Sequence, residues 1–306
     1  KDCIEKKFLN TEIIDLLRQR YKQNYKVSNN PQYTFFGNIK KSKNRLIKGI
    51  YDWDKKILEN NIKLYSKDAS ININKNKKEL KIVFLNSNAR SLISGNSKIL
   101  KDWKINVEGK EEFSGKKNLI DQDTNLTGCL TFLNLTVIDL KINSTDMHCE
   151  DSINFINTNG SINNLNILNS FSDGIDMDFS ELKINNIYVN NSRNDCIDFS
   201  YGIYEINKIS VYKCGDKGLS VGEKSKVKIK NFFSSYSNYG AVSKDSSKVT
   251  INNAEMSYLK YCLASYNKKL EFHGSFLKVE NLKCKNFYKK TFKDETSIIY
   301  LSKNEN

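Results

Sequence analysis

The sequence contains very little proline and histidine and no long hydrophobic run. One proline and 14 glycines among 306 residues exclude a linker-rich or disordered chain. No stretch of about 18 apolar residues occurs, so we expect no transmembrane segment. The seven cysteines show no C-x-x-C spacing, which argues against a zinc site. The length suits one elongated domain with an end cap, or two small domains.

A repeat of 22 residues runs through the middle and C-terminal parts of the chain. A column of small residues recurs at this spacing: Ser152, Gly174, Cys196, Gly218, Gly240 and Cys262. Strict periodicity of this length indicates a solenoid, in which each repeat buries its face only against its neighbours. Apolar residues follow each small one, and a helical pattern and leucine-rich offsets are absent. We therefore predict an all-β solenoid, a single-stranded right-handed parallel β-helix with coils of about 22 residues.

The sequence pattern divides the chain into three parts. Residues 1–120 are expected to form an N-terminal helix over about 1–28, a cap and the first irregular coils, with strands at Lys81–Leu85 and Trp103–Val107. Residues 121–290 are expected to form the regular β-helix, in which a loop of about 267–276 lengthens one coil. Residues 291–306 would form a C-terminal cap or tail, because the end of a stack exposes apolar surface and open strand edges.

Asparagine recurs at the second strand of most coils. The positions are Asn164, Asn186, Asn231, Asn253 and Asn281, with Lys208 interrupting the series. The side-chain amides would stack as a ladder at a bend and hydrogen-bond to one another. Asparagine suits this place because it tolerates the left-handed backbone conformation that bends need.

The positive charge is unevenly distributed. The chain has a net charge of +14, but the window 149–200 holds eight acidic and two basic residues. A basic body around an acidic stripe suggests a carboxylate site within a polyanion-attracting surface, or a cation site; the alternative is an ordinary solvated basic face. Cys196 and Cys262 share one column three coils apart, too far for a mutual disulfide, and we interpret them as small residues packed in a ladder. Disulfides stay possible without being indicated.

A polar column precedes the small residues and is the candidate site. Its members are Asp151, Asp173, Asp195, Lys217, Tyr239 and Tyr261. We expect them in a vertical row, about 5 Å apart, along one accessible wall of the solenoid. Strand alternation predicts that Asp176 and Asp178 also point to solvent.

Carboxylates at such spacing repel one another unless a proton, a lysine or a cation intervenes. The candidate Ca²⁺ ligands are Asp151, Asp173, Asp176, Asp195 and Asp198. In the alternative interpretation, Asp173 and Asp195 cap backbone amides of turns.

Three consecutive segments resemble motifs of the polygalacturonases, pectin-cleaving hydrolases of the pectate-lyase-like β-helix superfamily. They are Asp173-Gly174-Ile175-Asp176, Asn194-Asp195-Cys196-Ile197 and the run Gly215 to Gly222. The family patterns are N-T-D-G-x-D, D-D-C-I and G-H-G-L-S-I-G, and their order and spacing match over about 75 residues. A looser resemblance links the chain to β-helix proteins of bacterial surfaces.

The resemblance implies that Asp173 and Asp195 activate water. The family's general acid is replaced by Asn194 and its histidine by Lys217, and its R-I-K motif leaves only Lys244. An amide cannot deliver a proton to a leaving oxygen, so lyase or epimerase chemistry is considered beside hydrolysis.

Lyase or epimerase chemistry assigns other roles to the same region. Lys217, between Asp195 and Asp216, would be the base, although neighbouring acids raise its pKa. Tyr239 or Tyr261 would be the acid, and Arg193 or Lys244 would clamp the substrate carboxylate. Further candidate substrate contacts are Tyr239, Tyr261 and Tyr266, which could stack on sugar rings, and His148, which could reach the same groove.

Two function classes remain open from the sequence. The first is an enzyme that acts on an acidic, uronate-type polysaccharide by lyase, epimerase or hydrolase chemistry, with no required cofactor and with optional Ca²⁺. The second is a non-catalytic surface or coat β-helix that binds glycan or acts as an adhesin. Specific nucleic-acid binding ranks last, because no recognised motif accompanies the charge. We expect a monomer at an extracellular or cell-envelope location. The chain starts at Lys1 without Met, so we interpret it as a mature form or fragment, from which any signal peptide is already gone.

Overall fold

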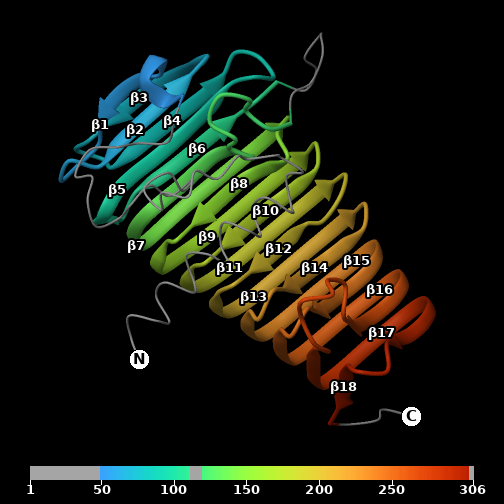
Figure 1. Ribbon diagram of the computed structural model, residues 1–306. Helices are drawn as coiled ribbons and strands as arrows, with labels where there is room; N and C mark the ends of the chain where they lie inside the picture. Colours follow the sequence, from blue (N-terminus) through green and yellow to red (C-terminus); the bar gives the residue numbers. More distant parts are fainter. Residues whose placement is uncertain (1–48, 111–118, 303–306) are drawn as a thin grey trace, which may run out of the picture. The chain divides into compact units, whose positions relative to one another are not determined.

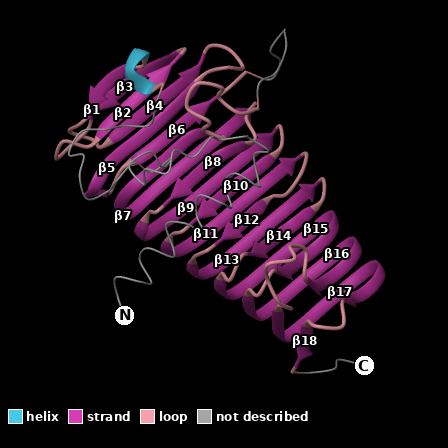
Figure 2. Ribbon diagram, in the orientation of Figure 1, coloured by secondary structure: helices cyan, strands magenta, loops and turns pink. Residues whose placement is uncertain are grey.

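The computed structural model describes residues 49–110 and 119–302. Two compact units, Lys1–Asp52 and Trp53–Asn306, divide the chain. Of the first unit the structure describes Gly49 and one turn of 3-10 helix, η1 (Ile50–Asp52). The helix predicted for residues 1–28 lies outside the described residues, as does Cys3. The second unit is an all-β solenoid built from an 18-stranded sheet (Figures 1 and 2).

The first six strands of the solenoid are β1 (Asp54–Ile57), β2 (Lys63–Lys67), β3 (Ala69–Asn74), β4 (Glu79–Phe84), β5 (Arg90–Lys101) and β6 (Lys104–Glu108). Antiparallel pairs β1–β2, β2–β5 and β3–β4 begin the stack. Parallel pairing starts where β4 meets β6 and β5 meets β7. The strands predicted at Lys81–Leu85 and Trp103–Val107 are confirmed as β4 and β6.

The remaining strands are β7 (Gly128–Met147), β8 (Asp151–Ile156), β9 (Asn159–Ser170), β10 (Asp173–Asp178), β11 (Glu181–Ser192), β12 (Ile197–Ser200), β13 (Ile203–Cys214), β14 (Lys217–Gly222), β15 (Lys226–Lys244), β16 (Lys248–Tyr266), β17 (Phe276–Lys293) and β18 (Ile298–Leu301). The middle coils each contribute a short and a long strand. The short strands β8, β10, β12 and β14 form one parallel stack, and the long strands β9, β11 and β13 form another. Each of β15, β16 and β17 continues both stacks.

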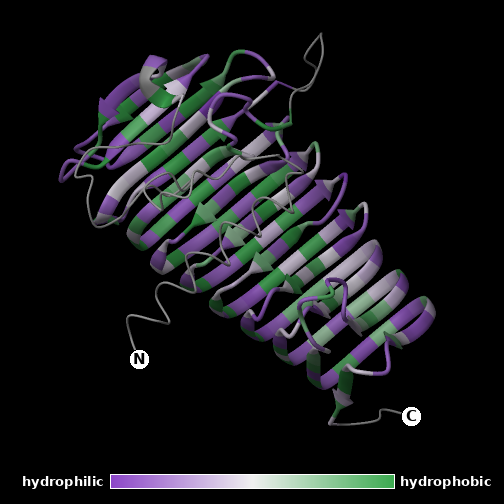
Figure 3. Ribbon diagram, in the orientation of Figure 1, coloured by the Kyte–Doolittle hydropathy of each residue, from purple (hydrophilic) through white to green (hydrophobic). Residues whose placement is uncertain are grey.

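The 22-residue register predicted from the sequence is confirmed by the strand pairing. Ile153 pairs with Ile175, and Ile175 pairs with Ile197. All three side chains are fully buried, and each such burial contributes about 1.5–3 kcal/mol. Hydrophilic and hydrophobic residues alternate along the strands, as expected for a coil with one face in the core (Figure 3).

The small-residue column is explained by the close approach of neighbouring coils. A Cβ at Gly174 would lie 2.5 Å from the carbonyl oxygen of Cys196. A Cβ at Gly240 would lie 2.5 Å from the carbonyl oxygen of Cys262. Both distances are shorter than van der Waals contact allows, so these positions need glycine while the coils keep their spacing.

The predicted asparagine ladder is present. Asn186 donates to Asn164 over 3.0 Å, Asn253 to Asn231 over 3.2 Å and Asn281 to Asn253 over 2.9 Å. The expectation that the ladder residues adopt the left-handed conformation is wrong. That conformation occurs at another corner of the coil, in a column made by Asn169, Asn191, Lys213, Tyr236 and Tyr258.

Three disulfides join cysteines within the described part of the solenoid. The pairs are Cys129–Cys149, Cys196–Cys214 and Cys262–Cys284, with Cα–Cα distances of 5.4, 5.3 and 6.5 Å. The interpretation of Cys196 and Cys262 as unpaired ladder residues is therefore wrong. The two are not bonded to each other, as predicted, but each has a partner 18 or 22 residues later in the chain. Columns compare equivalent positions of successive coils, so they do not reveal contacts between different positions.

Candidate functional site

The polar column of the sequence forms a continuous row in the structure. Asp151 and Asp173 are register partners on β8 and β10. The backbone N–H of Asp195 donates to Asp173 Oδ1 over 3.0 Å, and that of Lys217 donates to Asp195 Oδ1 over 3.1 Å. Tyr239 is the register partner of Lys217 and of Tyr261. The predicted alignment is confirmed, and we call these six residues the site column.

The predicted accessibility of the acidic half is wrong. Asp151 is 0% exposed, Asp173 6% and Asp195 4%. Asp176 and Asp178, expected to point to solvent, are 0% and 3% exposed. The prediction assumed that only the inner face of each short strand is covered, whereas every residue of β8, β10 and β14 is buried.

Asp173 and Asp195 bind main-chain amides of the following coil. Asp173 Oδ1 accepts the Asp195 N–H and also the side-chain amide of Asn194, over 2.7 Å. Asp195 Oδ1 accepts the N–H of Lys217. Carboxylates that accept backbone N–H groups make strong, charge-assisted bonds. These two aspartates therefore hold successive coils in register, in line with the capping interpretation.

Lys217 is enclosed by the acidic part of the site column. Its Nζ lies 3.3 and 3.4 Å from the carboxylate oxygens of Asp195 and also contacts Asp216 Oδ2. Burial lowers the pKa of Lys217, but the two carboxylates outweigh it and raise the pKa above its ordinary value. Burial raises the pKa of Asp195, against the opposing charge of Lys217. Lys217 is thus protonated at neutral pH and cannot act as a base in this arrangement.

A second buried charge cluster lies beside the first. Lys244 Nζ is 3.7 Å from Asp198 Oδ2, and both side chains are largely buried. Glu223 accepts a bond from Ser200 over 2.7 Å and pairs with Lys269 over 2.5 Å. Burial opposes ionisation of Glu223, yet Lys244 and Lys269 lower its pKa to about 2. For Lys244, burial is outweighed by Asp198 and Glu223, which raise its pKa.

The loop between β16 and β17 is fixed to this second cluster. The N–H groups of Lys268 and Lys269 donate to Asp245 Oδ1 over 2.7 and 2.8 Å. The charge of Lys244, followed by burial, lowers the pKa of Lys268. Sequence reasoning placed a loop here but missed Glu223, Asp245, Lys268 and Lys269, because these residues lie in turns and outside the repeated columns.

The C-terminal half of the site column opens into an aromatic surface, defined here as Tyr239, Tyr261, Tyr266, Tyr288 and Phe292. Tyr239 and Tyr261 stack with ring centroids 5.0 Å apart. Tyr261 also contacts Tyr288 at 6.4 Å and Phe292 at 5.6 Å, and Phe292 lies 6.0 Å from Tyr266. Tyr288 is 79% exposed and Phe292 39%. Sequence reasoning found the first three of these rings and missed the last two.

Lysines border the aromatic surface. Lys260 Nζ lies 5.6 Å from the centre of the Tyr261 ring, within the range of a cation–π contact. Lys289 is the register partner of Tyr261 on the next strand. Burial raises the pKa of both Tyr239 and Tyr266, so these hydroxyls stay protonated at neutral pH.

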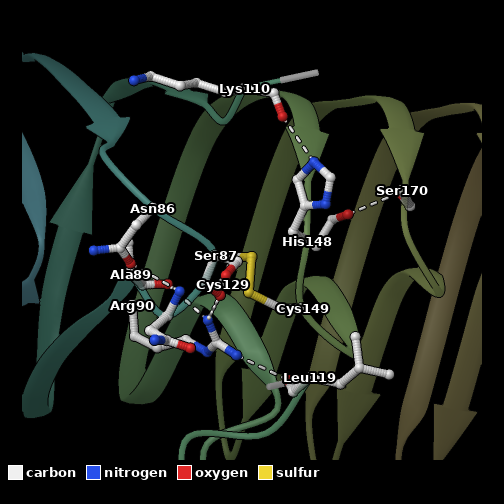
Figure 4. Close-up of a disulfide and its surroundings, with 12 residues drawn as sticks. Asn86, Ser87, Ala89, Arg90, Lys110, Leu119, Cys129, His148, Cys149 and Ser170 are labelled. Atoms are coloured by element: carbon white, nitrogen blue, oxygen red, sulfur yellow. Dashed lines mark hydrogen bonds between the residues drawn. A yellow bond between two sulfur atoms is a disulfide. The ribbon is translucent and has the colours of Figure 1, made fainter. Parts of the chain in front are cut away.

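Two predicted contacts lie on a different row. The Arg193 guanidinium stacks over Phe171 at 4.6 Å, and the His148 ring is 5.8 Å from the same Phe171. His148 Nε2 lies 2.7 Å from the carbonyl oxygen of Lys110, beside the Cys129–Cys149 disulfide (Figure 4). Arg90, in the same region, donates to the carbonyl oxygens of Ala89 and Leu119. These contacts tie together the coils around the disulfide.

The predicted calcium ligands do not form a cation cage in the structure. Among residues 49–110 and 119–302, no group of three or more His, Cys, Asp or Glu side chains is arranged to hold a metal ion. The Ca²⁺ hypothesis therefore gains no support from the described residues. The same part of the chain has no helix with the length and apolar character required to cross a bilayer.

Comparison with known proteins finds no relative. Neither a family model, nor a curated protein, nor a solved structure matches the chain significantly. The resemblance to the polygalacturonases thus stays a prediction. The observations define a β-solenoid with a buried charge column that ends in an exposed aromatic surface.

Proposed function

We propose that this chain is a non-catalytic β-solenoid that binds an acidic polysaccharide. The aromatic surface is the observation that carries the proposal. Five rings from three successive strands are in mutual contact, half-buried to exposed, with Lys260 and Lys289 beside them. Aromatic faces pack against sugar rings, and ammonium groups pair with carboxylates, so the combination suits a uronate-type polymer.

The burial of the carboxylates favours binding over cleavage. A glycosidase needs two carboxyl groups that reach the scissile bond, one of them able to give a proton. Here Asp173 and Asp195 are buried against backbone amides, and Asn194 occupies the family's acid position. The raised pKa of Lys217 likewise argues against the base that a lyase or epimerase requires.

The charge clusters have a supporting role in this proposal. Lys217 and Lys244 bind carboxylates on neighbouring coils and so fix the strands that carry Tyr239, Tyr261 and Tyr266. A rigid aromatic platform loses little conformational entropy when it binds a polymer. Three disulfides support a location outside the cytosol, where such polymers occur as surface or matrix material.

Binding to defined polymers tests the proposal. Polygalacturonate and alginate are titrated into the protein and heat is recorded, with Tyr288→Ala as the test variant and Tyr188→Ala as the control. Both tyrosines are exposed, but Tyr188 is not part of the aromatic surface. We expect Tyr288→Ala to weaken uronate binding about tenfold, which corresponds to about 1.4 kcal/mol, and Tyr188→Ala to leave it unchanged.

Two results would contradict the proposal. The first is the absence of wild-type binding to either polymer. The second is the release of unsaturated products or new reducing ends, which would reinstate the enzyme hypothesis. In that case Lys268, whose pKa is lowered, and Tyr266 would be the first residues to substitute.

A further inference from the structure

A groove crosses the long strands of the solenoid, away from the residues of the aromatic surface. It has a volume of about 780 Å³ and spans β9, β11, β13, β15 and β16 at equivalent positions. These strands lie next to one another along the stack (Figure 1). With strands about 4.8 Å apart, five of them give a groove roughly 20 Å long that runs along the solenoid axis.

A row of carboxamides lines the groove. Asn207 donates to Asn185 over 3.0 Å, and Asn185 donates to Asn163 over 3.3 Å; Asn252 extends the row beyond Lys230. Each carboxamide has two N–H donors and two acceptor lone pairs, of which the ladder uses one each. The row therefore keeps donor and acceptor capacity on every coil, in an orientation fixed by the ladder.

Charged residues of both signs form a second row. Lys183, Glu205 and Lys228 are register partners on successive strands, and Ser161 precedes them. The Lys183–Glu205 pair, at 3.8 Å, is 78% and 50% exposed, so it contributes little stability and rearranges easily. A polyanion would meet Glu205 in this row, and a polycation would meet the lysines.

The lining thus selects against several ligand classes. Its residues include no aromatic side chain on which a nucleic-acid base could stack. Its isoleucines, such as Ile184 and Ile206, are at most 4% exposed, which leaves no apolar floor for a hydrophobic peptide. Evenly spaced donors and acceptors without a dominant charge suit a linear polymer with repeating hydroxyl or acetamido groups.

We propose that this groove binds an uncharged linear glycan lying parallel to the solenoid axis, with the carboxamide row of Asn163, Asn185 and Asn207 as its hydrogen-bonding track. The proposal is independent of acidic-polymer binding at the aromatic surface. It assigns the protein a second glycan surface with a different ligand chemistry.

Titration with short neutral glycans tests the groove. Cellohexaose, chitohexaose and maltohexaose are the probes, and heat or intrinsic fluorescence is the signal. The test variant combines Asn185→Ala with Asn207→Ala. The matched control combines Asn231→Ala with Asn253→Ala, which removes a rung of the neighbouring ladder that does not line the groove.

At least one probe is expected to bind the wild-type protein. The groove variant should lower its affinity tenfold or more, while the ladder control and Tyr288→Ala keep wild-type affinity. Circular dichroism and urea unfolding verify that both double variants are folded. The proposal is overturned if no probe binds at millimolar concentration, or if the groove variant binds as tightly as the control. Loss of uronate binding in Tyr288→Ala with neutral binding intact separates the two surfaces.

Discussion

Lys244 is the residue on which the second charge cluster depends. It lies between Asp198 and Glu223, and its side chain is 6% exposed. Removing one partner of a buried pair leaves an uncompensated charge and costs about 3–5 kcal/mol. We predict that Lys244→Met lowers the free energy of unfolding by about that amount in urea titrations. Lys248→Met, at an exposed position, is the control and should change it by less than about 0.5 kcal/mol.

A loss below about 1 kcal/mol for Lys244→Met would contradict this prediction. Combining Lys244→Met with Asp198→Asn should restore part of the loss, since the second change removes the carboxylate left without its cation.

Glu223 gives the cluster a defined pH dependence. Its pKa in the folded protein is about 2, against an ordinary value of 4.5, because of Lys244 and Lys269. A depressed folded pKa means that the stabilisation is complete above the ordinary value and is lost as the pH falls from about 4.5 through about 2. The shift corresponds to about 3 kcal/mol.

The comparison with Glu223→Gln isolates this contribution. We expect the variant to be less stable than the wild type at pH 6 and the difference to shrink steadily as the pH falls towards 2. Urea midpoints measured at several pH values provide the check. A difference that stays constant over this range would show that the Glu223 carboxylate is not the group that titrates.

Periodicity predicts which residues share a column but not what covers them. Asp151, Asp173 and Asp195 could be aligned from the sequence, since their spacing follows directly from the 22-residue coil. Their burial could not, because strand alternation reports two faces and only the folded chain shows whether both are packed. The partner of Lys244 was equally hidden, since Glu223 belongs to a turn without a repeated position.

At the level of the coil, each disulfide closes a loop of about one turn of the solenoid. Cys196 and Cys214 are 18 residues apart and join the short-strand stack to the long one. Cross-links that close loops of this size usually contribute about 2–4 kcal/mol, chiefly by restricting the unfolded chain. We predict that Cys196→Ser combined with Cys214→Ser lowers the free energy of unfolding by that amount.

Urea unfolding with and without a reductant measures the effect. Reductant should destabilise the wild type more than the double variant, because the variant has one bond fewer to lose. Equal sensitivity of the two proteins would mean that the Cys196–Cys214 bond does not form in solution.

The longest coil shows why the aromatic surface was only partly predictable. The regular repeat places Lys283 below Tyr261, but the observed register partner is Lys289, since the loop of residues 267–275 adds six residues to this coil. Tyr288 and Phe292 therefore fall outside every column drawn at 22-residue spacing. An insertion within one repeat shifts all later contacts, and the sequence shows the insertion without showing where the register resumes.

At the scale of the solenoid, the two proposed surfaces differ in charge. The aromatic surface has Lys260 and Lys289 at its border, whereas the groove combines Lys183, Lys228 and Glu205. The chain as a whole is basic, with a net charge of +14. Its long-range field therefore attracts acidic polymers and has little effect on neutral ones.

Ionic strength should consequently separate the two binding events. Exposed charges farther apart than about 10 Å are screened at 0.1 M salt and more strongly at 1 M. We predict that affinity for polygalacturonate falls at least tenfold between 0.05 and 0.5 M NaCl, while affinity for the neutral hexasaccharide changes less than twofold. Lys289→Gln should reduce the salt dependence of the first and leave the second unchanged. Parallel titrations across the salt series make the measurement, and a neutral ligand that weakens in step with the uronate would mean that both polymers bind one charged surface.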